Sequence, residues 1–310
     1  MGLASVTVDL DSLAHYCRIH GLDEAVLDVR ARRAVYATAV PRLCEAFGAA
    51  GLTATFFAIG EDLAEPRHAQ ALAAAAAAGH EVASHSHRHD YALSRLPAPA
   101  IAEDLRRAEE AILAAVGQRP VGFRAPGYTL SAALYRALCD RGYRYDSSVF
   151  PAAPYYLAKA AVMGARAAVG RPSRAVLDTP RVLLAPRRPY RPDPADPYRK
   201  GEGSALELPV TVAPGSRFPY IGTFALTLPA WVERALYFTL RAEPLFNLEL
   251  HAIDVLDEAD GVPAALCRVQ PEQRAPLSRR LSRLAELCRR LTADFEVCPL
   301  ADAASRSGLV

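Results

Sequence analysis

Short apolar and β-branched runs alternate with longer helical patterns along the first half of the chain. Residues 5–9 and 81–84 have the composition of strands, and residues 54–59 form an almost entirely apolar run. Such a run is typical of a parallel strand that is covered on both faces. Helical patterns at residues 32–50 and 66–79 separate these runs. This order predicts βαβ units with right-handed connections, and therefore a barrel-like α/β fold.

The same pattern continues beyond residue 100. We expect helices at residues 100–116, 130–142, 229–240 and 278–291, strands at 121–123 and 245–250, and an ordered segment at 205–212. The sequence contains no internal repeat. A single domain over residues 1–310, which ends in a helix and a closing strand within residues 278–310, is the simplest account.

Residues 151–203 depart from this pattern. Seven prolines between residues 172 and 197 exclude long regular elements there, and nine basic residues stand against three acidic ones between residues 165 and 200. We interpret the segment as a solvated insertion; the alternative is a rim that contacts an anionic or lipid-linked substrate. Within it, residues 155–165 are expected to form a packed helix, and peripheral contact with a membrane is the less favoured alternative.

Composition limits the classes of function. With 310 residues, 51% of them hydrophobic, the chain can bury a large core. The net charge of +2 gives no global field that would attract nucleic acid, so we expect no such partner. We find no signal peptide and no spanning helix, and the six cysteines are far apart. A cytoplasmic protein is expected, and its oligomeric state is left open.

Polar residues follow the predicted strands, at the point where each strand ends. Because the carboxyl ends of parallel strands share one face of a barrel, residues far apart in the sequence converge there. This convergence is the main evidence for a functional site. The residues are Asp9, Asp11, His85, His87, His89, Arg124, Asp146 and His251.

A metal site is expected from the histidines after the third strand. His85 and His89, together with Asp11 on a neighbouring strand end, supply two imidazole nitrogens and one carboxylate oxygen. Zinc in catalytic sites takes three such ligands and keeps one position open. We predict zinc, with another divalent transition metal as the alternative. His87 is expected to point elsewhere, and an exposed histidine-rich loop is the competing interpretation.

Metal-assisted hydrolysis also needs a general base and a general acid. Asp9 lies two residues before Asp11, so in a strand both carboxylates face the same side; a turn or helix-cap role is the alternative. His251 ends an apolar strand and could act as the acid, tuned by a carboxylate such as Asp146 or Asp254. A structural histidine is the alternative.

Residues 122–128 combine a guanidinium group with a rigid backbone. Arg124 could orient a carboxylate, and the backbone amide after Pro126, near Tyr128, could face a developing oxyanion. Taken alone, an arginine two residues before a proline is also common where a strand ends.

Taken together, the set resembles the polysaccharide deacetylase superfamily, the carbohydrate esterases with the NodB-homology fold. The resemblance implies a distorted (β/α) barrel and a divalent metal held by Asp11, His85 and His89. It also implies that Asp9 is the base and is held by Arg124, and that His251 is the acid with Asp146 beside it. The matching segments are residues 7–11 (TVDLD), 54–57 (ATFF), 85–89 (HSHRH), 123–128 (FRAPGY), 145–148 (YDSS) and 250–251 (LH).

The first motif departs from the commonest family pattern, which has two adjacent aspartates followed by glycine. Here Leu10 separates Asp9 from Asp11 and Ser12 follows, as in a branch whose members act on varied C–N bonds. The expected function is therefore metal-dependent removal of an N-acyl group, most simply acetyl, from an amino sugar or a related small substrate. The alternatives are a deacylase of another amide, including a lipid-linked sugar, a metal hydrolase of another barrel class, and a catalytically silent glycan-binding barrel.

Overall fold

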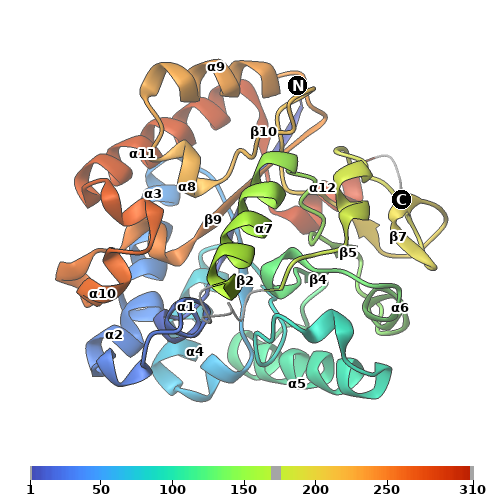
Figure 1. Cartoon of the computed structure of the whole chain (residues 1–310), viewed down its shortest axis with the longest axis horizontal. Coiled ribbons are helices and arrows are strands. Elements are labelled where there is room, and N and C mark those ends of the chain that lie inside the picture. Colours follow the sequence, from blue (N-terminus) through green and yellow to red (C-terminus); the bar gives the residue numbers. More distant parts are fainter. Residues whose placement is uncertain (1, 169–175, 308–310) are drawn as a thin grey trace.

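A curled sheet of parallel strands forms the centre of the computed structural model, which describes residues 2–168 and 176–307 (Figure 1). The sheet runs in the order β10-β1-β2-β3-β4-β5-β8, and β9 also pairs with β1. Its strands are β1 (Leu3–Asp9), β2 (Thr55–Ala58), β3 (Glu81–Ser84), β4 (Gly122–Phe123), β5 (Tyr145–Asp146), β8 (Leu206–Glu207), β9 (Leu245–His251) and β10 (Glu296–Val297).

The far end of the sheet turns back toward β9. The backbone N–H of Thr211 donates to the carbonyl of Asn247 (3.2 Å), and Ile221 bridges to Glu249 in β9. The sheet is thus curled into a half-barrel and covered by helices. This confirms the α/β barrel-type fold expected from the alternating pattern.

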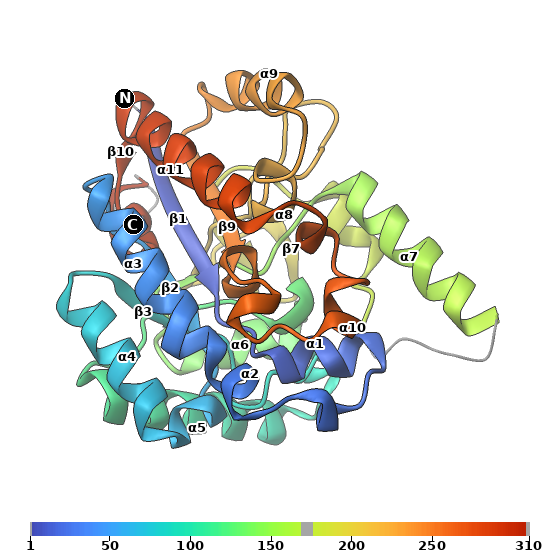
Figure 2. The ribbon, with the colours of Figure 1, turned by 90° about the vertical axis from the view of Figure 1, so that its left-hand side faces the viewer.

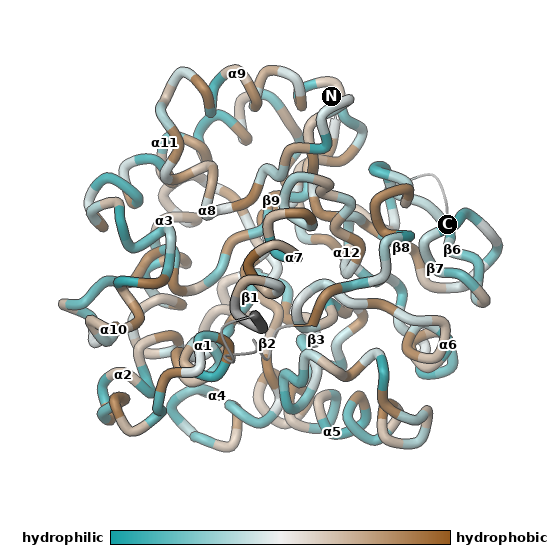
Figure 3. The backbone as a smooth tube through the Cα atoms, in the orientation of Figure 1, coloured by the Kyte–Doolittle hydropathy of each residue, from teal (hydrophilic) through white to brown (hydrophobic). Residues whose placement is uncertain are grey.

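Helices surround the sheet and connect its parallel strands. Hydrophilic residues lie on the outer turns of peripheral helices such as α4 and α5 (Figure 3). The helices are α1 (Leu13–His20), α2 (Val29–Ala34), α3 (Val40–Ala49), α4 (Pro66–Ala77), α5 (Ala98–Val116), α6 (Ala132–Asp140), α7 (Ala153–Ala168), α8 (Gly222–Ala225), α9 (Ala230–Leu240), α10 (Ala264–Cys267), α11 (Leu277–Asp294) and α12 (Leu300–Arg306).

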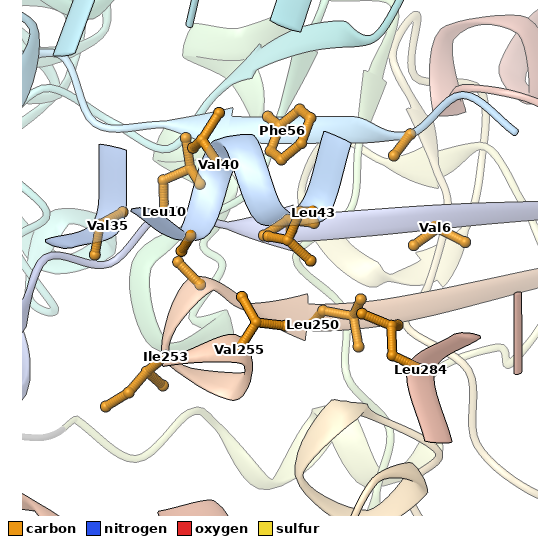
Figure 4. Packing of buried hydrophobic residues seen from close by; sticks show 14 of the residues in the cluster. Val6, Leu10, Val35, Val40, Leu43, Phe56, Leu250, Ile253, Val255 and Leu284 are labelled. Carbon is orange, nitrogen blue, oxygen red and sulfur yellow. The ribbon is translucent and has the colours of Figure 1, made fainter. Parts of the chain in front are cut away.

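The largest core cluster fills the space between one face of the sheet and the helices α3 and α11 (Figure 4). Val6 in β1 and Phe56 in β2 are fully buried, as are Leu43 from α3 and Leu284 from α11. Burial of side chains of this size stabilises the fold by about 1.5–3 kcal/mol each. The predicted helix at residues 32–50 is present as α2 and α3, joined by a π-helical stretch, Val35–Ala39.

The pairing register of β1 and β9 places the expected site residues on one face of the sheet. Asp9 at the end of β1 pairs with His251 at the end of β9 and with Phe57 in β2. Thr7 pairs in the same way with Glu249. Since side chains alternate along a strand, Asp9 and His251 lie side by side on one face of the sheet.

The insertion contains a helix at the residues where one was expected, 155–165. This helix, α7, spans 16 residues and extends beyond both expected ends. The seven prolines that exclude long regular elements all follow it, and Pro154 stands in its first turn, where a missing N–H costs little. Beyond α7 lies a short antiparallel pair, β6 (Pro192–Asp193) and β7 (Asp196–Lys200). Arg171, Arg174 and Pro172 fall outside the described residues.

The end of the chain returns to the first strand. β10 follows α11 and pairs in parallel with β1, and α12, which was not predicted, follows β10. Among the described residues, no helix is both long and apolar enough to cross a membrane.

Candidate metal centre and catalytic site

Asp11, His85 and His89 converge at the carboxyl end of the sheet, and all three are buried. The Nε2 atoms of His89 and His85 lie 2.9 and 3.3 Å from Asp11 Oδ1, and 3.2 Å from each other. A tetrahedral zinc site with bonds of about 2.0–2.1 Å places neighbouring ligand atoms about 3.3 Å apart. The spacing of these three atoms therefore fits one metal ion.

The orientation of His85 supports the same assignment. Its Nδ1 lies 2.7 Å from the carbonyl oxygen of Arg124, to which a ring N–H donates, so the neutral ring would present a lone pair at Nε2. That lone pair would face Asp11 Oδ1, which is also an acceptor. Because two acceptors repel each other at this distance, a proton or a metal ion has to lie between the Nε2 atom and the carboxylate oxygen. Burial opposes a positive charge on His85, but Asp9 and Asp11 together raise its pKa above the usual value.

The same buried surroundings shift the pKa values of Asp11 and His89. Burial would raise the pKa of Asp11, but His89 and His85 hold it well below its usual value. Burial lowers the pKa of His89 to about 4, against the opposing charge of Asp11. A carboxylate beside a neutral imidazole is the protonation state in which these residues bind a metal.

A strained loop presents the two histidines. Ser86 and His89 both have left-handed backbone angles, with φ of 66° and 51°. Such angles are costly for residues other than glycine and persist where the surrounding structure enforces them. Here the carboxylate of Asp104 accepts hydrogen bonds from the N–H groups of His87 and Arg88, at 2.8 and 3.2 Å. His87 is not part of the metal group.

Asp9 is held next to this group by Arg124. Arg124 Nη1 donates to Asp9 Oδ1 at 2.7 Å and to Thr7 Oγ1 at 3.0 Å, and both charged side chains are almost completely buried. The other carboxylate oxygen of Asp9 lies 3.8 Å from His85 Nε2. The carboxylate thus lies beside the metal group with one oxygen turned toward it, as a base for a reacting water needs to be.

The carboxylate in contact with His251 is Glu249. Its Oε1 lies 2.7 Å from His251 Nδ1, and Glu249 is fully buried. Asp254 Oδ2 accepts the backbone N–H of His251 at 2.9 Å. Burial would lower the pKa of His251, but Glu249, with Asp11 and Asp9, raises it well above the usual value.

Glu249 is not among the residues expected from the sequence, although a signal for it was present. A charged side chain stands inside a strand made mainly of apolar residues, two residues before the histidine and therefore on the same face.

Asp146 does not lie beside His251 as expected. Ser148 Oγ donates to Asp146 Oδ1 at 2.5 Å, and Asp146 also interacts with Glu207 in the adjacent strand β8. Burial raises the pKa of Asp146 to about 6. The physical reason is topological: β5 pairs with β4 and β8, whereas β9 pairs with β1.

The segment after Arg124 adopts a tight turn. Pro126 and Tyr128 are buried, and Tyr128 has a left-handed φ of 60°. The N–H of Tyr128 itself donates to the carbonyl of Ala125 at 3.0 Å. Consequently the amide of Gly127, directly after the proline, is the better candidate for facing an oxyanion, and Gly127 lines the pocket described next.

A pocket of about 510 Å³ opens onto these residues. Asp9, Asp11, His85 and His251 form its polar end, and the remaining wall comes from several other elements, including α7. A cavity of this size accommodates a small substrate.

Comparisons with known proteins bear on the family and on the fold. Residues 33–145 match the family model described as polysaccharide deacetylase, a span that contains His85, His89 and Arg124 but not Asp9, Asp11 or His251. No curated protein sequence matches the chain.

Several solved structures share the fold. A Mycobacterium smegmatis protein with a provisional polysaccharide deacetylase name is 20% identical, with a TM-score of 0.62 over 98% of this chain and 89% of its own. A Pseudomonas aeruginosa PAO1 protein with a similar provisional name and a protein named Puue allantoinase are each 18% identical, with TM-scores of 0.58 and 0.57. Both matches cover 98% of this chain and 89% of the other. Residues 33–145 therefore match the polysaccharide deacetylase family model, and the chain as a whole shares its fold with these solved structures.

Proposed function

We propose that this protein is a metal-dependent hydrolase that removes an N-acyl group from an amine. The observation that carries the proposal is the convergence of a buried two-histidine, one-aspartate group with Asp9 and His251 on adjacent strands. The family match supports deacetylation as the reaction, and an N-acetylated amino sugar is the simplest substrate of that class.

Asp11, His85 and His89 would hold the metal, and zinc suits this set of donors. When bound, zinc would polarise the amide carbonyl and lower the pKa of a water molecule. Asp9 accepts the proton of the attacking water. Arg124 donates a hydrogen bond to the Asp9 carboxylate and fixes its orientation.

His251 supplies the proton for the leaving amine. Contact with Glu249 raises its pKa, so the imidazolium form persists near neutral pH and can donate. In this proposal the N–H of Gly127, which lines the pocket, donates to the oxyanion that develops on the carbonyl oxygen. Together these residues provide a base, an acid and an oxyanion donor around one pocket.

Two further assignments belong to this proposal. The allantoinase among the similar structures favours a second candidate, hydrolysis of a C–N bond in a small non-sugar amide. The six cysteines are all free thiols, which supports a reducing compartment such as the cytoplasm.

The test compares two histidines of one loop, through the variants His89→Ala and His87→Ala. Bound zinc is measured by elemental analysis, and released amine is measured with a panel of N-acetylated amino sugars, N-acetylalkylamines and small cyclic amides. We expect His89→Ala to lose zinc and amine release, and His87→Ala to keep both. Equal zinc content in the two variants would refute the ligand assignment, and a wild-type protein that releases no amine from any member would count against the function.

A further inference from the structure

The pocket extends beyond its polar end into a region lined by apolar side chains. Ile19 from α1, Val162 and Met163 from α7, Phe224 from α8 and Val269 after α10 all line it. These residues come from four separate parts of the chain. The region is continuous with the metal group, because one pocket contains both.

Several polar side chains in the same wall already have partners or are buried. His20 Nε2 lies 3.3 Å from Gln270 Oε1, and Lys159 Nζ lies 3.5 Å from the carbonyl oxygen of Gly127. Glu272 is only 4% exposed. The surface left for a ligand in this region is therefore mainly hydrocarbon.

Helix α7 is attached to the catalytic segment. The ring of Phe150 lies 5.1 Å from those of Tyr128 and Tyr155, so an aromatic series links the turn after Arg124 to the first turn of α7. Tyr156 Oη donates to the carbonyl of Asp178 at 3.0 Å. These contacts hold the start of α7 at a fixed position relative to the site, although its far end extends away from the body of the molecule (Figure 2).

We propose that this region binds an aliphatic chain of the substrate, so that the enzyme acts on an N-acyl amine with an apolar group rather than on a polar polysaccharide. The inference rests on the proposed function and specifies its substrate. An apolar wall gains free energy from each methylene that it removes from water, whereas sugar hydroxyls would lose hydrogen bonds against it. The chain belongs either to the acyl group or to the amine.

Two substrate series separate these sources. In one, N-acetyl derivatives of butylamine, hexylamine and octylamine lengthen the amine; in the other, butylamine carries acetyl, butanoyl and hexanoyl groups. With the zinc-loaded protein, we expect KM to fall about two- to fourfold per added methylene in one series. Equal KM values across both series, or a lower KM for N-acetylated oligosaccharides, would overturn the proposal.

Two residues of α7 provide matched variants. Val162 and Leu157 are 60% and 63% exposed, but only Val162 lines the pocket. Val162→Asp should abolish most of the dependence on chain length, and Leu157→Asp should preserve it. If both variants retained the dependence, α7 would not be the binding wall.

Equilibrium binding keeps this test separate from the test of the reaction. Titration calorimetry with the same N-acetylalkylamines measures affinity even where no hydrolysis occurs. Affinity that rises with chain length, without turnover, would support the apolar site and count against the hydrolase assignment. Turnover without any dependence of affinity or KM on chain length would support the hydrolase assignment and count against the apolar site.

Discussion

Asp9 is the side chain on which the proposed removal of a proton from water depends. Replacing it by asparagine keeps the size and removes the basic oxygen, so Asp9→Asn should lower kcat by about 10²–10⁴-fold while zinc remains bound. Steady-state kinetics and elemental analysis on the same preparation measure both quantities. Full activity in this variant would exclude Asp9 as the base.

Glu249 acts through His251 and is a positioning residue. Its carboxylate raises the pKa of His251, so the wild-type acid should lose its proton only at alkaline pH. In Glu249→Gln the pKa of His251 falls, and the alkaline limb of the kcat/KM profile should move to lower pH. The pH profile distinguishes this role from a structural one, because a purely structural loss would lower activity without moving the limb.

Arg124 is a fully buried cation whose main charged partner is Asp9. Arg124→Met leaves the Asp9 carboxylate buried without its partner, and loss of one member of such a pair costs about 3–5 kcal/mol in the free energy of unfolding. Urea denaturation measures this change.

Arg106→Met is the control for this variant. Arg106 forms its ion pairs with Glu103 and Glu110 on the exposed face of α5, so its loss should change stability little. Similar losses in the two variants would contradict the argument from burial.

The sequence predicts which residues belong to the site better than it predicts which of them lie in contact. Asp11, His85 and His89 come together because each directly follows or closely follows a strand, which is readable from local pattern. The partner of His251 depends on which strands are adjacent, and adjacency is a property of the assembled sheet. That is why Asp146 was expected beside His251 and Glu249 was overlooked.

Among the elements, the short strand β4 shows how closely the sheet packs. A methyl group on Gly122 would lie 1.9 Å from Cζ of Tyr145, whose ring is buried and whose hydroxyl donates to Glu81 at 2.9 Å. Because the ring cannot move aside without losing that hydrogen bond, Gly122→Ala should destabilise the protein by about 1–3 kcal/mol or more.

Gly48→Ala provides the control in helix α3. A methyl group there meets no atom within 4 Å, and alanine favours a helix over glycine by about 0.5–1 kcal/mol. Thermal unfolding should therefore show opposite shifts of the two melting temperatures. Stabilisation by both substitutions would contradict the packing argument.

Elements with strong periodicity were predicted closely, and irregular ones were not. The strands β1, β2 and β3 and the helices α4, α5 and α11 lie within a few residues of their expected bounds. The helix expected at residues 155–165 is present as α7, which extends a few residues beyond both expected ends. The short α1 was not predicted; it begins only four residues after the end of β1, where the pattern of polar residues is typical of a strand end followed by a loop.

At the level of the whole molecule, the half-barrel brings residues from opposite ends of the chain to one pocket. Asp9 and His251 are register partners although more than two hundred residues separate them. The fold thus supplies the geometry, and the identities of a few strand-end side chains supply the chemistry.

The central claim is that Asp11, His85 and His89 hold a metal ion on which amide hydrolysis depends. The most direct test is the rate of amine release by chelator-treated protein as zinc is added back, with the best substrate from the N-acyl amine panel. We predict no rate above background without zinc, and an increase that saturates at about one zinc ion per chain. An unchanged rate in metal-free protein would contradict the account.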